Sequence, residues 1–157
     1  MKQYYNDFGT WLRRRFPYKV QKISIDAGFT CPNRDGLTGR GGCTYCDNRT
    51  FNPAYCNRKK TIAEQLEDGK RFFSKKYPTM KYLAYFQAYT NTYSSLESLR
   101  RMYEEALSVE DVVGIVIGTR PDCMPEVLLP EQAATHSANI SSMKTTSVCC
   151  LPHRKTT

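Results

Sequence analysis

The stretch VVGIVI at residues 112–117 decides the fold of this chain. Five of its six residues are apolar and β-branched, which favours a strand, and the apolar run is nearly continuous. Such a run is typical of a strand buried on both faces, as in the parallel sheets of α/β proteins. Because parallel strands need long crossover connections, we expect helices between this strand and the strands before it.

Two earlier segments carry strand signals of their own. KVQKISID at residues 19–26 alternates between polar and apolar side chains, and YLAYFQA at residues 82–88 is largely apolar. Both patterns predict strands, which gives the chain three strands in all.

A capping-box motif lies in each gap between the predicted strands. Residues 61–64, TIAE, predict a helix that runs to about residue 77, and residues 94–97, SSLE, predict one that runs to about residue 108. Apolar residues are expected along one face of each helix: Ile62, Leu66 and Phe73 in the first, and Leu96, Leu99, Tyr103 and Leu107 in the second.

The resulting β-loop-α-β-α-β order predicts parallel strands with right-handed crossovers. In sheets of this class, ligands collect at the carboxyl ends of the strands. The long loop at residues 27–60, the segment QAYTNTY at 87–93 and the turn GTRPD at 118–122 each follow a predicted strand. We therefore expect a functional site where these three segments meet.

The chain changes character after residue 126. All 19 aromatic residues lie at or before Tyr103, and nine of the 27 residues from Glu131 onward are Ser or Thr. Such a segment buries too little apolar surface to offset its ordering entropy. We expect one patterned unit over residues 1–126 and a poorly structured, disordered tail over residues 127–157, whose sequence resembles an out-of-frame translation or a truncated copy.

Composition narrows the class of protein. The net charge of +8 favours an anionic partner such as nucleic acid, nucleotide or phosphate, although many basic proteins bind none of these. No apolar run approaches the roughly 18 residues of a membrane span, and the first residues lack the apolar core of a secretory signal. With seven cysteines and no such signal, we expect a cytoplasmic protein, without a membrane partner, that uses thiols for metal or redox chemistry.

Three of those cysteines lie close together in CPNRDGLTGRGGCTYC, residues 31–46. Cys31, Cys43 and Cys46 have C-x11-C-x2-C spacing, and four glycines separate the first two. Three thiolates on one glycine-rich loop suit a soft metal, and an iron–sulfur cluster in particular. Three ligands would leave one iron of a cluster open to another molecule.

The same residues fit a second interpretation. Cys56 could complete a closed tetrahedral zinc site of four thiolates, which would be structural. The alternative function is therefore a cysteine-rich structural zinc module, or a module that binds RNA through its basic charge. Arg13, Arg14 and Arg15 favour a solvated face over a nucleic-acid patch, and Cys123 is expected to be a small buried apolar residue.

Three sequence blocks, in this order, resemble the radical S-adenosylmethionine (SAM) superfamily: CPNRDGLTGRGGCTYC, YLAYFQAYTNTY and GTRPDC. In particular, the chain is similar to bacterial proteins that share the elongator catalytic subunit's type of radical SAM domain. The likeness covers roughly residues 8–126. Its long cysteine spacing, in place of the superfamily's usual C-x3-C-x2-C, is typical of that bacterial group.

This resemblance implies a fold and a chemistry. The fold would be the N-terminal half of a (β/α)6 partial TIM-type barrel, because the chain supplies three of the six βα units. Cys31, Cys43 and Cys46 would hold three irons of a [4Fe-4S] cluster, and the fourth iron would chelate SAM. One electron would then cleave SAM to methionine and a 5′-deoxyadenosyl radical, which abstracts hydrogen from a substrate.

The resemblance also implies roles for three cofactor-binding residues. Tyr45 matches the aromatic residue beside the SAM adenine, Gln87 lies where members contact the SAM amino group, and Arg120 could bind a carboxylate bidentately. No side chain is assigned a catalytic role. The implied partners are an electron donor such as flavodoxin or ferredoxin and an unidentified substrate, for which RNA is only weakly indicated.

Overall fold

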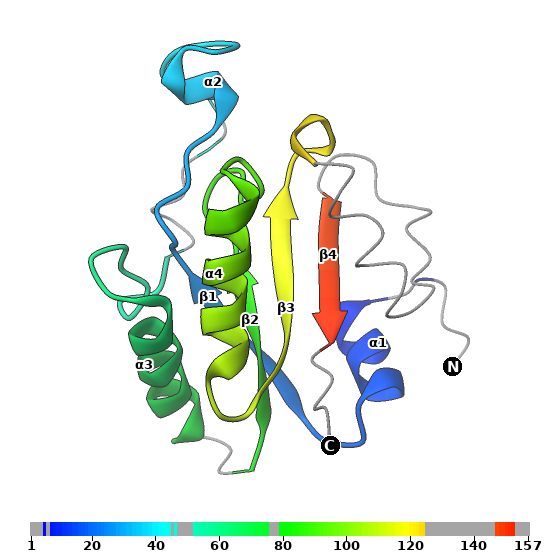
Figure 1. Cartoon of the computed structure of the whole chain (residues 1–157). Helices are drawn as coiled ribbons and strands as arrows, with labels where there is room; N and C mark the ends of the chain where they lie inside the picture. The colour runs from blue at the N-terminus through cyan, green and yellow to red at the C-terminus, as the bar shows by residue number, and fades with distance from the viewer. Residues whose placement is uncertain are drawn as a thin grey trace.

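The computed structural model describes residues 5, 7–44, 46, 52–75, 79–124 and 147–152, the last of these as backbone alone. Helices and strands alternate along most of this length (Figure 1). In chain order the elements are α1 (Phe8–Arg15), β1 (Val20–Ile25), α2 (Pro32–Asp35), α3 (Ile62–Ser74), β2 (Lys81–Phe86), α4 (Leu96–Ser108), β3 (Val112–Thr119), the short 3-10 helix η2 (Pro121–Cys123) and β4 (Ser147–Pro152).

The three predicted strands form a parallel sheet in the order β1-β2-β3. Ile23 of β1 is in register with Ala84 of β2, which is in register with Ile115 of β3. β3 is buried along nearly its whole length, as its apolar run predicts. The predicted α/β class and the parallel pairing are therefore confirmed.

A fourth strand departs from the prediction of a tail without regular structure. β4 pairs with β3 in antiparallel register, Ile115 opposite Leu151 and Thr119 opposite Ser147, and lies at the outer edge of the sheet (Figure 1). The edge of β3 offers a row of backbone N–H and C=O groups, and a strand satisfies them whatever its sequence pattern. Composition carries no signal for pairing of this kind.

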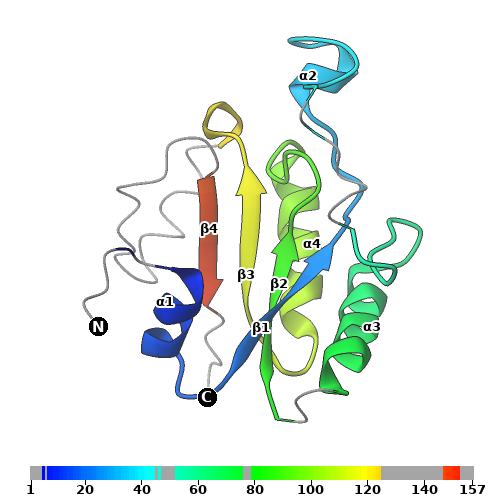
Figure 2. The same ribbon diagram turned by 180° about the vertical axis from the view of Figure 1, so that it is seen from behind.

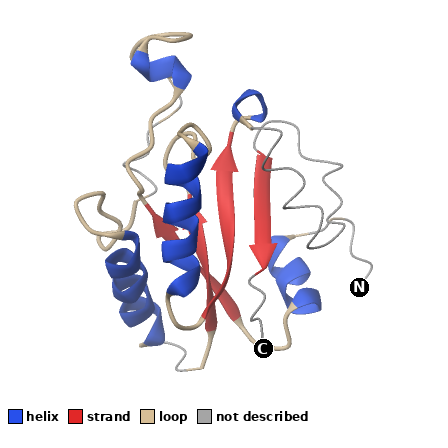
Figure 3. Ribbon diagram, viewed as in Figure 1, coloured by secondary structure: helices blue, strands red, loops and turns tan. Residues whose placement is uncertain are grey.

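Helices α3 and α4 cover one face of the sheet, and the main core lies beneath them (Figure 3). Leu66 of α3 and Leu99 of α4 are fully buried there, and Gly69 of α3 approaches Ile23 so closely that an added Cβ would overlap that side chain. The capping box of Thr61 and Glu64 is confirmed, since each accepts a hydrogen bond from the other's backbone N–H.

The start of α4 corrects two predictions. The N-cap is Ser95, whose hydroxyl accepts from the Ser98 N–H at 3.3 Å, so the predicted box of Ser94 with Glu97 is wrong by one residue. Leu96, expected on the buried face, is 43% exposed. It is the first residue of α4, and the buried residues of the helix begin at Leu99. Either of the adjacent serines can serve as an N-cap, although only Ser94 has a glutamate three residues later.

Helix α1, which the sequence analysis did not predict, covers the opposite face of the sheet (Figure 2). The Asp7 carboxylate caps it by accepting from the Thr10 N–H at 2.8 Å. Leu12 packs against Leu83 of β2 and Val116 of β3. Successive side chains of a strand point to opposite faces, so these two residues face α1 while their neighbours in the strands face α3 and α4. The last turn of α1 carries three exposed arginines, Arg13, Arg14 and Arg15.

None of the helices in the part of the chain that the structure describes is long and apolar enough to cross a membrane.

Candidate functional site

The loop after β1 contains the short helix α2, which lies beyond the carboxyl ends of β1, β2 and β3 (Figure 1). Cys31 is its N-cap, with its carbonyl accepting from the Arg34 N–H at 2.8 Å, and Pro32 opens the first turn. Gly36 ends the helix with a φ of 101°, a left-handed conformation that glycine adopts without strain. The predicted cysteine loop is thus locally folded at its first cysteine.

The second cysteine is held against the same short helix. The Asn33 carbonyl accepts from the Gly42 N–H at 2.9 Å, which folds the glycine-rich loop back onto α2. The Asn33 side-chain amide then donates to Cys43 Sγ at 3.1 Å. One asparagine therefore fixes the return of the loop and supplies a hydrogen bond to the cysteine sulfur.

Two contacts fasten α2 to the loop after β2. The Arg34 guanidinium lies over the Tyr89 ring, with its carbon 4.7 Å from the ring centroid. A hydrogen bond with Asp35 raises the pKa of the Tyr93 hydroxyl. Tyr89 itself has a φ of 65°, a strained conformation for a non-glycine residue. The cysteine loop is therefore anchored on the sheet by side chains from the QAYTNTY segment.

Cys31 receives hydrogen bonds from two other strand ends. Arg120, which follows β3, places Nη1 3.7 Å from Cys31 Sγ, and Thr90 of the loop after β2 also bonds the thiol. Burial raises the pKa of Cys31, but the hydrogen bonds from Thr90, the Asn33 N–H and Arg120 outweigh it, so the net pKa lies below its ordinary value. The thiolate is the form that binds metal.

The third predicted ligand, Cys46, is exposed, and its N–H donates to the Cys43 carbonyl at 3.0 Å. Among the described residues, no group of three or more His, Cys, Asp or Glu side chains is placed to hold a metal ion. Cys31 and Cys43 thus share one folded loop, and the three sulfurs are not assembled as a ligand set. The donors nevertheless fit a thiolate-ligated metal, because N–H groups face two of the three sulfurs. Tyr45 lies outside the described residues.

Gln87 lies at the carboxyl end of β2, where the sequence predicts a cofactor contact. Its side-chain carbonyl accepts from the Ser24 hydroxyl of β1 at 3.3 Å. The side chain is half-buried and belongs to the same edge of the sheet as Arg120 and Cys31. The structure thus confirms the shared edge for Gln87 and Arg120 and leaves their binding roles as predictions.

A buried polar cluster behind this edge was missed by sequence analysis. Asn91 is fully buried, and its side-chain amide donates to the Gly118 carbonyl at 2.7 Å, while Tyr103 Oη donates to the Asn91 carbonyl at 2.6 Å. Thr92 and Thr119, also buried, share a short hydrogen bond between their hydroxyls. The available signal was the polar run Thr90-Asn91-Thr92, a few residues after an apolar strand.

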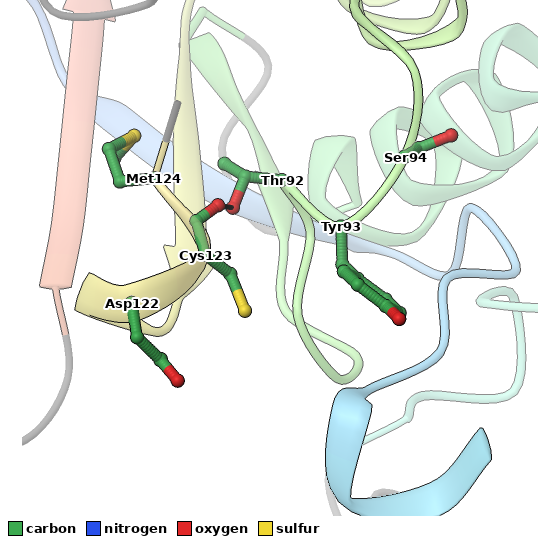
Figure 4. A pocket seen from close by; sticks show the side chains of 6 residues that line it. All are labelled: Thr92, Tyr93, Ser94, Asp122, Cys123 and Met124. Atoms are coloured by element: carbon green, nitrogen blue, oxygen red, sulfur yellow. Dashed lines mark hydrogen bonds between the residues drawn. The ribbon is translucent and has the colours of Figure 1, made fainter. Parts of the chain in front are cut away.

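An open pocket of about 440 Å³ lies between the loop after β2 and the turn after β3 (Figure 4). Tyr93 and Cys123 lie on facing sides of it, and the other lining residues are Thr92, Ser94, Asp122 and Met124. Cys123 is partly exposed rather than fully buried, and burial, together with Asp122, raises its pKa. Hydroxyl, carboxyl and thiol groups line this pocket together with a larger share of apolar side-chain surface, close to Cys31 and Arg120.

Cys56, the fourth ligand of the zinc interpretation, belongs to the main core instead. It is 8% exposed and lies in the apolar cluster that contains Tyr55 and Ile62. Burial, with the nearby Asp26 carboxylate, raises the pKa of Cys56 to about 11, so the thiol is protonated at neutral pH. This environment does not favour a thiolate ligand.

The raised pKa of Cys56 predicts a loss of stability in alkali. Below its ordinary value of 9.0 the folded and unfolded chains both keep the proton, whereas at higher pH the unfolded chain releases it first. Between about pH 8 and about pH 10.5, the free energy of unfolding should fall by about 1–2 kcal/mol more in the wild type than in Cys56→Ala. Urea denaturation at both pH values measures the free energy of unfolding. An equal fall with pH in the wild type and in Cys56→Ala would contradict the assignment.

Comparison with known proteins finds relatives longer than this chain. It is 45% identical over 124 residues to protein YhcC of Escherichia coli strain K12, an overlap of 79% of this chain and 39% of that protein. It is 44% identical over 122 residues to uncharacterized protein YtqA of Bacillus subtilis strain 168, covering 78% and 38%. Uncharacterized protein MJ0486 of Methanocaldococcus jannaschii is 34% identical over 119 residues, covering 74% and 35%.

The chain therefore spans about two fifths or less of the length of these relatives. No family model and no solved structure matches it. Because none of the three names states an activity, a functional argument has to rest on the residues at the carboxyl edge of the sheet.

Proposed function

We propose that this chain carries the cluster-binding part of a radical SAM protein. Cys31, Cys43 and Cys46 would hold three irons of a [4Fe-4S] cluster, and the fourth iron would remain for SAM. One observation carries the proposal: thiols of a single loop lie at the carboxyl edge of a parallel sheet, with N–H donors aimed at two of the sulfurs. Hydrogen bonds to ligand sulfurs are a usual feature of iron–sulfur sites.

The open arrangement of the three sulfurs is compatible with this proposal. Metal binding can be coupled to local folding of the ligands. Arg120 contacts the sulfur of Cys31, the N-cap of α2, and Asn33 holds Cys43 against the same helix. Cys46, in contrast, is exposed. On binding, Cys46 would therefore be the ligand that moves most.

The rest of the edge would position SAM. When bound, the cluster and SAM supply a reducing electron and a 5′-deoxyadenosyl radical for hydrogen abstraction. Gln87 would accept from the SAM amino group through the oxygen that now accepts from Ser24, and Tyr45 would lie beside the adenine. The open pocket between Tyr93 and Cys123 would remain for other groups of SAM or for substrate.

We further propose that the three parallel strands correspond to the N-terminal half of a (β/α)6 partial barrel. The support is the order β1-β2-β3 with α3 and α4 on one face, and the greater length of the relatives. Substrate contacts would then come mainly from the part of the fold that this chain does not supply. A donor such as flavodoxin or ferredoxin would deliver the electron.

The metal itself tests the proposal. The full chain should be reconstituted anaerobically with iron and sulfide, in parallel with zinc, and analysed for metal and sulfide after gel filtration. We expect about four irons and four sulfides per chain, with weaker retention of zinc. Tightly held zinc with no iron would favour the structural module, in which case a ligand other than the buried Cys56 would have to complete the site.

A further inference from the structure

Arg120 makes two kinds of contact at once. Its Nε donates to Asp122 Oδ1 at 2.9 Å and its Nη2 to Oδ2 at 2.6 Å, a bidentate pair. The remaining amino group, Nη1, lies 3.7 Å from Cys31 Sγ. The Arg120 side chain is 30% exposed and that of Asp122 is 60% exposed, so the pair lies at the surface while Nη1 is directed inward.

The bidentate pair determines where Nη1 points. A guanidinium is planar, with five donors in a rigid fork, so occupation of one edge fixes the direction of the others. Here Asp122, two residues further along the chain, occupies one edge of the Arg120 guanidinium. Asp122 lies in the 3-10 helix η2, which Pro121 opens. The side-on edge, formed by Nε and Nη2, is therefore already taken by a carboxylate of the protein, and Nη1 is directed at Cys31.

The contact also crosses the sheet. β1 and β3 are not neighbours, because β2 lies between them, yet Arg120 after β3 reaches the cysteine that follows β1. Thr90, from the loop after β2, holds the same segment through its N–H, which donates to the Thr30 carbonyl at 3.2 Å. Cys31 is thus fixed from two strand ends beyond its own.

We infer that Arg120 is a positioning residue for the Cys31 sulfur, locked by Asp122, rather than the ligand of a cofactor carboxylate. This inference rests on the proposed cluster for its chemical consequence. A cationic N–H donor at a ligand sulfur stabilises added negative charge, so it should raise the reduction potential of a cluster bound there. It would also hold the first cysteine in place before the exposed Cys46 joins the site.

The contact can be tested in the metal-free chain by NMR of the arginine side chains. Restrained guanidinium N–H signals are expected for Arg120. They should shift in Cys31→Ala and be lost by rapid exchange in Asp122→Asn. Asp68→Asn is the matched control, because it removes the carboxylate partner of Arg71 on the remote helix α3. Arg120 signals that do not respond to Cys31→Ala would overturn the inference whether or not a cluster binds.

The reconstituted chain supplies the second test, an EPR-monitored redox titration of Arg120→Gln. At the wild-type midpoint potential, the ratio of reduced to oxidised cluster should drop about tenfold, equivalent to about 59 mV for one electron. Arg71→Gln changes the net charge equally, far from the site, and should leave the potential unchanged. Equal iron content and an unchanged potential in Arg120→Gln would reject the inference while the cluster proposal stands. Absence of iron in the wild type would instead reject the cluster proposal.

Discussion

Replacement of Cys31, Cys43 or Cys46 by alanine is expected to abolish cluster retention after anaerobic reconstitution. In the proposed site, three cysteine thiolates each hold one iron of the cluster. Each variant would leave only two of these ligands. The loss should be nearly complete for each of the three, including the exposed Cys46. Iron and sulfide per chain, with visible absorption, measure the effect.

Cys123→Ala is the matched control for these three variants. Cys123 is partly exposed and lies beside Arg120, so it samples the same environment without belonging to the predicted ligand set. It should retain the wild-type content of iron. Retention of iron by Cys43→Ala or Cys46→Ala, or its loss from Cys123→Ala, would show that the ligand assignment is wrong.

Phe86→Ala is expected to cause the largest loss of stability among single truncations. Phe86 is fully buried between the sheet and α4, with its ring 5.1 Å from that of Tyr103 in an edge-to-face pair. Removal of a buried aromatic ring costs about 3–5 kcal/mol, from lost transfer energy and the cavity left behind. Against a total stability of about 5–15 kcal/mol for a typical domain, such a loss could unfold the chain at moderate temperature.

Phe72→Ala provides the comparison. Phe72 is 60% exposed and contacts Phe73 and Tyr55 at the surface end of α3, so its removal should cost no more than about 1–1.5 kcal/mol. Chemical denaturation monitored by circular dichroism distinguishes the two variants. Equal destabilisation by both would mean that the core is not centred on Phe86, and would contradict the packing of α4 on β2.

Hydrophobic pattern was enough to predict the three parallel strands of the sheet. The strand over residues 112–117 is confirmed within β3, the segment at 19–26 contains β1, and the segment at 82–88 overlaps β2, which begins one residue earlier at Lys81. These segments bury apolar residues at strand spacing, and that burial is what the sequence records. Two short elements left weaker signals in the sequence. Helix α2 begins after Cys31 and ends at Gly36, and β4 depends on backbone pairing with β3.

The location of the candidate site was predictable from the sequence, but the contacts between its side chains were not. The rule for parallel sheets placed Gln87 and Arg120 at one edge, and the structure puts them there. That Arg120 is already paired with Asp122 could not be predicted, because the fork geometry depends on the 3-10 turn after β3. The buried Asn91 was missed because nothing in its immediate sequence marks the Gly118 carbonyl, 27 residues away, as its partner.

The central claim is that three cysteines of one loop hold a cluster with an open iron. EPR of the reduced, reconstituted full chain, recorded with and without SAM, tests it most directly. The account predicts a [4Fe-4S] signal whose g values change on addition of SAM, because SAM binds the iron that no cysteine occupies. A cluster signal unaffected by SAM, or a chain that retains zinc and no iron, would contradict it.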